Sequence, residues 1–112
     1  MSVPYRFVRA RPHRDHLADL RERLDSGEIA GMDPFGDAMT TALDRARLDP
    51  ETGEAVWVEE DYCSPPLAME RAEVLEDYFA AIRIVEEDVD ETSAWARSED
   101  LPGLWDRMLE DA

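Results

Sequence analysis

Residues 55–61 are Ala-Val-Trp-Val-Glu-Glu-Asp, and residues 82–88 are Ile-Arg-Ile-Val-Glu-Glu-Asp. In both stretches an apolar run stands directly before the same three acids. Runs rich in Val, Ile and Trp favour β-strands, so the first stretch predicts a strand. The second stretch also fits the end of a preceding helix, because apolar residues from Leu75 to Val85 follow helical spacing. We expect a strand there as well, which gives a fold of mixed helices and sheet.

Local signals around these stretches predict the other elements. Gly27 follows a run of leucines at helical spacing and stands where a helix commonly ends in left-handed backbone. Asp33 and Pro34 are suited to the cap and the first turn of another helix. These signals place a strand at 3–11 and helices at 13–26, at 34–48 and from Ser64 onward.

The resulting element order predicts an α+β protein. A small, mostly antiparallel sheet with helices on one face is the simplest packing, and a ferredoxin-like arrangement is the leading expectation. The 112 residues fit a single domain over 1–112. Residues 95–112 form an aromatic tail that we expect to pack on the core or on a partner. An open sheet face would favour a homo-oligomer, most simply a dimer.

The strongest compositional signal is negative charge. The chain has 28 Asp plus Glu against 12 basic residues, all of them Arg, for a net charge of −16. Such a charge makes a small domain repel itself in dilute buffer, whereas molar salt screens the repulsion. We therefore interpret the acidity as adaptation to a salt-filled cytoplasm. An acidic surface selected for a basic partner, mimicking nucleic acid, is the alternative.

Several classes of function are disfavoured by the sequence. The one cysteine, Cys63, excludes an intrachain disulfide, and no apolar run has the length of a signal peptide or a membrane span. A nucleic-acid binder needs a basic face, which the chain lacks. The five glycines form no phosphate-binding loop, so no cofactor is expected. We expect a soluble, cytoplasmic protein without a nucleic-acid or membrane partner.

The two acid triplets are candidate metal ligands. If the strands that precede them are parallel and joined by a helix, both triplets leave the sheet at the same edge. Hard cations such as Mg²⁺ or Ca²⁺ prefer oxygen ligands of this kind. The alternative is a solvated rim of acids adapted to salt. The candidate residues are Glu59, Glu60, Asp61, Glu86, Glu87 and Asp88.

Four other side chains are candidates for catalysis. His13 and His16 are three residues apart, as are His16 and Asp19, so each pair can share one face of a helix and relay a proton or bind a metal. Cys63 stands at a predicted strand-to-helix turn, where a thiol can become nucleophilic. The alternatives are exposed histidines and a small buried cysteine.

Residues 9–31 resemble the YciI-like family of dimeric ferredoxin-like proteins. The similar features are Arg11-Pro12-His13 after a strand, a Leu-rich helix from His16, and the glycines Gly27 and Gly31. The resemblance implies a His–Asp pair in a cleft, with His13 or His16 as its histidine. It covers about a fifth of the chain and ends at the predicted helix 34–48, where that family has a strand. As a whole, the chain resembles small acidic proteins of haloarchaea.

The favoured function is a small, non-enzymatic module that binds a ligand or a protein. A large apolar patch on one face would support this interpretation. The alternative is a small YciI-like enzyme, which requires His13, His16 or Cys63 in a concave pocket with a second polar group in reach.

Overall fold

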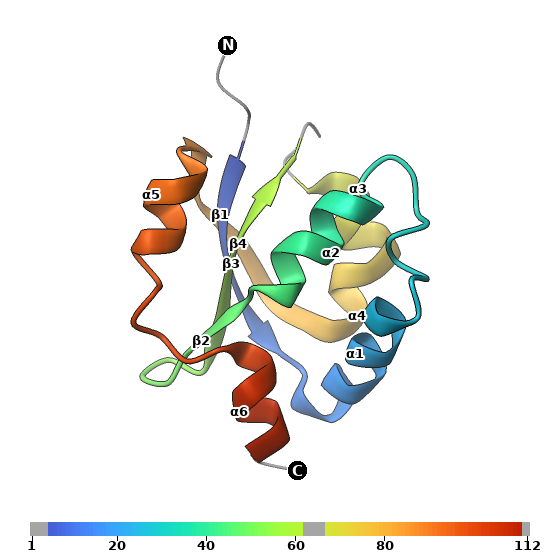
Figure 1. Cartoon of the computed structure of the whole chain (residues 1–112), viewed down its shortest axis with the longest axis horizontal. Helices are drawn as coiled ribbons and strands as arrows, with labels where there is room; N and C mark the ends of the chain where they lie inside the picture. Colours follow the sequence, from blue (N-terminus) through green and yellow to red (C-terminus); the bar gives the residue numbers. More distant parts are fainter. Residues whose placement is uncertain (1–4, 62–66, 111–112) are drawn as a thin grey trace.

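The computed structural model describes residues 5–61 and 67–110. Its centre is one four-stranded antiparallel sheet in the order β2-β3-β1-β4 (Figure 1). The strands are β1 (Tyr5–Pro12), β2 (Arg47–Asp49), β3 (Glu54–Glu60) and β4 (Phe79–Val89). The expected α+β class with a small antiparallel sheet is confirmed, and 82–88 is a strand.

Strand β1 lies between β3 and β4 in the sheet, although β2 and β3 follow it in the sequence. β3 and β4 are both antiparallel to β1 and lie on either side of it, so they run parallel to each other. The described chain therefore has the split β-α-β-β-α-β connectivity, with further helices after β4. A ferredoxin-like arrangement agrees with this order and otherwise stays a prediction.

Helices cover both faces of the sheet, unequally. Figure 1 shows α1, α2 and the α3–α4 segment on one face and α5 on the other. No helix in the described ranges is long and apolar enough to cross a bilayer. The helices are η1 (Arg14–His16), α1 (Leu17–Asp25), α2 (Gly36–Asp44), α3 (Ala68–Glu70), a π-helical turn η2 (Arg71–Leu75), α4 (Glu76–Tyr78), α5 (Glu91–Ala96) and α6 (Leu104–Glu110).

The core lies between the sheet and its larger helical layer. β3 is buried from Glu54 to Glu59, because helices and neighbouring strands surround it. The Trp57 ring stacks at a tilt on Phe79, with 5.0 Å between ring centroids. From the tail, Leu104 and Trp105 are buried, and the Trp105 indole N–H donates to the Leu43 carbonyl at 2.7 Å. The first residues of α6 thus pack on this chain's own core.

The predicted helix 34–48 is wrong at both ends. The helix begins at Gly36, with Phe35 at its cap position, so Asp33 does not cap it. Residues 47–49 form strand β2 because they pair with Glu54–Val56 across a tight turn. Cross-strand pairing therefore overrides the helical pattern of the local sequence. The predicted left-handed end at Gly27 is confirmed, with φ of 84°, whereas the predicted cap Ser64 lies outside the described residues.

Gly36 is required by a close backbone approach. A Cβ on Gly36 would lie 2.3 Å from the Ile29 carbonyl oxygen and 2.7 Å from that of Ala30. We expect Gly36→Ala to lower the free energy of unfolding by about 1–3 kcal/mol, as overpacking does. Gly31→Ala is the matched control, because its Cβ would make only ordinary contacts of 3.6 Å or more. Urea unfolding followed by circular dichroism measures both, and equal losses would contradict the prediction.

Candidate functional site

A hollow that combines aromatic, aliphatic and acidic side chains lies where strand β2 stops. β2 pairs with β3 only as far as Val56, so beyond that residue β3 has a ladder partner on the β1 side alone among the described strands. Here α2 and α5 flank β3 from opposite faces and leave a cavity of about 410 Å³, which we call the edge pocket. It is lined by Tyr5, Pro34, Phe35, Asp37, Ala38, Thr41, Ala42, Arg45, Val58, Glu60, Glu70, Glu91 and Trp95.

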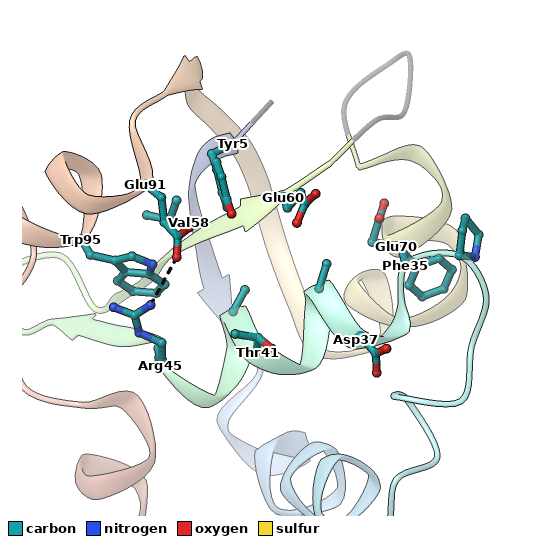
Figure 2. A pocket seen from close by; sticks show the side chains of 13 residues that line it. Tyr5, Phe35, Asp37, Thr41, Arg45, Val58, Glu60, Glu70, Glu91 and Trp95 are labelled. Carbon is teal, nitrogen blue, oxygen red and sulfur yellow. Dashed lines mark ion pairs between the residues drawn. The ribbon is translucent and has the colours of Figure 1, made fainter. Parts of the chain in front are cut away.

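The edge pocket is elongated and combines aromatic with acidic side chains. In Figure 2, Trp95, Glu91 and Arg45 lie at one end, Phe35 and Glu70 at the other. Tyr5 and Glu60 lie between them, above helix α2. A ligand in this pocket would therefore meet aromatic rings at both ends and carboxylates along its length.

Arg45 is the one cationic side chain in the described lining, and other groups already hold it. Its guanidinium lies 4.3 Å from the centroid of the Trp95 ring, a cation–π contact. It also forms an ion pair with Glu91 at 3.6 Å (Figure 2). Arg45 and Glu91 thus largely offset each other at this end of the pocket. The other acids of the lining are Asp37, Glu60 and Glu70.

The number of acids in the edge pocket is close to what composition predicts, but the burial of one of them, Glu70, is unusual. A quarter of all residues are Asp or Glu, and four acids among thirteen lining residues match that share. Glu70, however, is only 2% exposed. Carboxylates adapted to salt lie in water, and fully buried ones are uncommon unless something compensates their charge. Its burial therefore distinguishes Glu70 from the solvated acids that composition alone predicts.

A second buried carboxyl, Glu59, lies near Glu70 but outside the pocket lining. Glu59 is 1% exposed, and its Oε1 accepts a hydrogen bond from the Trp57 indole N–H at 3.1 Å. Its Oε2 has no hydrogen-bond partner among the residues that the structure describes. Burial raises the pKa of Glu59 well above its usual value, and the charges of Glu70 and Asp61 raise it further. Burial in the core thus disfavours the charged form of Glu59 in the folded chain.

The acid triplets do leave the sheet at the same end, but an arginine stands between them. Arg6 of β1 contacts Asp61 at 3.4 Å and Asp88 at 3.2 Å. Asp61 also accepts from the Leu67 backbone N–H at 2.7 Å, and Glu86 pairs with Arg97 at 2.9 Å. Within the described ranges, no group of three or more His, Cys, Asp or Glu side chains could hold a metal ion.

The other three residues of the triplets lie in three different environments. Glu60 lines the edge pocket, Glu59 is buried in the core, and Glu87 is exposed. A strand turns successive side chains to opposite faces, so three consecutive acids cannot all converge on one cation. The condition of parallel strands is met by β3 and β4, but Arg6 of β1, between them, supplies a counter-charge.

The histidine candidates lie on the surface. His13 and His16 are both exposed, with ring centroids 5.9 Å apart. His16 Nδ1 lies 3.3 Å from the Asp77 carbonyl oxygen, and His16 shares an open pocket with Asp19 and Tyr78. These rings are therefore outside the edge pocket.

Asp19 accepts a hydrogen bond from Tyr78. The Tyr78 hydroxyl donates to Asp19 Oδ2 at 2.5 Å and accepts from Arg23 at 3.0 Å. Burial, followed by the bond to Asp19, raises the pKa of Tyr78. The His16–Asp19 pair proposed from spacing thus lies in one hollow, but the hydrogen bond of Asp19 is made with Tyr78. Cys63 lies outside the described residues.

The face of the sheet beside α5 carries charge. Arg9 donates to Asp49 at 3.1 Å and to Glu54 at 3.3 Å, and Arg83 also donates to Glu54, at 3.0 Å from one of its nitrogens. These bonds, led by that of Arg83, lower the pKa of Glu54. Among the described residues, Met69 and Val85 are the only exposed large apolar side chains. The large apolar patch anticipated for a partner is not found in this part of the chain.

A comparison with protein-family models, curated proteins and solved structures finds no match. The resemblance of residues 9–31 to YciI-like proteins therefore stays a prediction. Of the pocket residues, Glu70 and Arg45 were missed from the sequence, because neither stands in a motif. Trp95 was singled out only as part of an aromatic tail. The one signal in the sequence was that Glu70 lies within residues 67–82, whose apolar residues recur at helical spacing.

Proposed function

We propose that this chain is a small binding module whose edge pocket accepts an organic cation with an apolar body. The observation that carries the proposal is the buried carboxyl of Glu70 in an aromatic-lined cavity. A cavity of about 410 Å³ lies within the ~300–1,000 Å³ typical of small-molecule sites. A cation bound there would lie beside the Glu70 carboxyl, and the aromatic rings would contact its apolar part.

The chain is proposed to bind its ligand without transforming it. Neither histidine belongs to the described lining of the edge pocket. The pocket offers aromatic faces and carboxylates, which recognise an ammonium group by charge and by cation–π contact. The high surface acidity is a separate proposed property, adaptation to molar salt, and is tested separately in the Discussion.

The test is a titration with benzyltrimethylammonium, followed by NMR shifts of backbone amides in α2 and α5 at fixed KCl. We expect saturable shifts with the cation and none with benzyl alcohol, which has a similar ring but no charge. Glu70→Gln should weaken binding roughly tenfold, because a contact with a buried charge contributes about 1.5–3 kcal/mol. Glu60→Gln provides a second variant if Glu70→Gln does not fold.

Glu87→Gln is the matched control, because it removes one exposed acid far along β4 and changes the net charge equally. Its affinity should equal that of the unmodified chain. Equal weakening by Glu87→Gln and Glu70→Gln would mean that the cation responds only to overall charge. That result, or equal binding of benzyl alcohol, would overturn the proposal.

A further inference from the structure

A second hollow, at the other end of strand β1, has the opposite chemistry. It has a volume of about 460 Å³ and is lined by three arginines, Arg11, Arg14 and Arg107, together with the β2–β3 turn. The edge pocket includes Tyr5 at the start of β1, whereas this arginine pocket includes Arg11 and Pro12 at its end. The two hollows are therefore separate sites.

The composition of this arginine pocket runs against that of the chain. Asp and Glu are a quarter of all residues, and Arg is about a tenth. Eight residues drawn at random from this sequence would include about two acids and one arginine. The eight described lining residues include three arginines and no acid. Surface adaptation to salt, which distributes acids widely, does not produce such a site.

Three separate segments bring the arginines together. Arg11 comes from the end of β1, Arg14 from η1 and Arg107 from α6. All three side chains are exposed, and Arg11 takes part in none of the ion pairs found among the described residues. Three guanidinium groups from separate segments therefore lie around one hollow of small-ligand size.

The turn beside the arginines follows Asp49, which is outside the pocket lining, and contains Thr52, which contributes a hydroxyl to it. Asp49 accepts from Arg9 at 3.1 Å and from the Glu51 backbone N–H at 3.0 Å, so its carboxylate is engaged outside the pocket. Thr52 Oγ1 accepts from the Glu54 backbone N–H at 3.1 Å. The hydroxyl proton of Thr52 can therefore be donated to a bound anion.

We propose that the arginine pocket binds a small polyvalent oxyanion, of the kind presented by a phosphorylated metabolite. Guanidinium groups bind phosphate oxygens through paired, charge-assisted hydrogen bonds, which chloride cannot reproduce. A polyanion such as nucleic acid is disfavoured, because the net charge of −16 repels an extended phosphate backbone. A small anion meets only the local field of the arginines.

The experiment is a titration with inorganic pyrophosphate at fixed KCl, followed by backbone amide shifts at Arg11, Thr52 and Gly53. We expect saturable binding that is tighter than that of inorganic phosphate, because pyrophosphate offers more oxygens to three arginines. Arg11→Gln and Arg14→Gln should each weaken it about tenfold, the effect of one charge-assisted hydrogen bond. Circular dichroism verifies that each variant is folded.

Arg71→Gln is the matched control. The substitution removes the same charge from a residue of η2, which is outside the pocket lining. Unchanged affinity in Arg71→Gln, together with weakening in either pocket variant, supports the proposal. Absence of saturable binding overturns it, as does equal weakening in all three variants. Glu70→Gln should leave pyrophosphate binding unchanged, so this test is independent of the edge pocket.

Discussion

The midpoint of thermal unfolding is expected to rise steeply with KCl, by tens of degrees between dilute buffer and molar salt. The chain has 28 acids against 12 arginines, and folding concentrates this excess charge in a small volume. The Debye length falls from about 10 Å at 0.1 M to about 3 Å at 1 M, so molar salt removes most of the repulsion between surface acids.

Ion pairs act in the opposite direction but are too weak to reverse this trend. KCl also screens the attraction in pairs such as Arg21–Asp25, Arg71–Glu76 and Arg97–Glu86. Each exposed pair contributes only about 0–1 kcal/mol. The chain has 28 acids and 12 arginines, an excess of 16 negative charges that arginines cannot neutralise. The repulsion within this excess acts over longer distances than the pairs, so it determines the sign of the salt effect.

A charge-reduced variant separates screening from the general salting-out effect of concentrated salt. Replacing exposed acids by their amides, as in Glu73→Gln, Glu87→Gln, Glu99→Gln and Asp100→Asn, should raise the midpoint in dilute buffer and flatten its dependence on KCl. Circular dichroism melts over a KCl series measure both slopes. A midpoint indifferent to KCl in the unmodified chain would refute salt adaptation, and equal slopes in the two proteins would assign the effect to salting-out.

The sheet could be predicted because its strands carry local signals. The apolar runs of β3 and β4 each stand before an acid triplet, and both became strands parallel to each other. Strand β2 could not be predicted in this way. Its three residues, 47–49, continue a helical pattern, and only pairing with Glu54–Val56 makes them a strand.

The pockets could not be predicted, because they depend on where elements end. The edge pocket exists because β2 stops at its pair with Val56 and α5 crosses to the second face. The arginine pocket requires α6 to bring Arg107 next to Arg11 across most of the sequence. Local sequence patterns predict neither pocket, since both pockets depend on contacts between residues far apart in the sequence.

One buried acid could have been recognised from the two-residue period of a strand. Trp57 and Glu59 are two residues apart in β3, so they share a face of the sheet. A core position for Trp57 therefore implies a core position for Glu59, and the hydrogen bond from the indole N–H to Glu59 agrees with this. The uniform acidity of the triplet concealed the difference between Glu59 and its neighbours.

Glu59→Gln is expected to stabilise the fold increasingly as pH rises above about 5. The pKa of Glu59 is raised by burial above its ordinary value of 4.5, and the charges of Glu70 and Asp61 raise it further. A group of this kind leaves stability intact below the unfolded pKa and reduces it as pH rises toward the folded pKa. Between the two values the loss approaches about 1.4 kcal/mol per pH unit.

Glutamine removes this loss and keeps the acceptor that Glu59 offers to the Trp57 indole. The difference in unfolding free energy between Glu59→Gln and the unmodified chain should therefore be small near the unfolded pKa of 4.5 and grow as pH rises above it. Urea unfolding at fixed KCl measures it at each pH. Glu87→Gln removes an equal charge from an exposed position and should give a difference that is independent of pH. A flat difference for Glu59→Gln, or the same rise in Glu87→Gln, would mean that burial does not hold Glu59 in its neutral form.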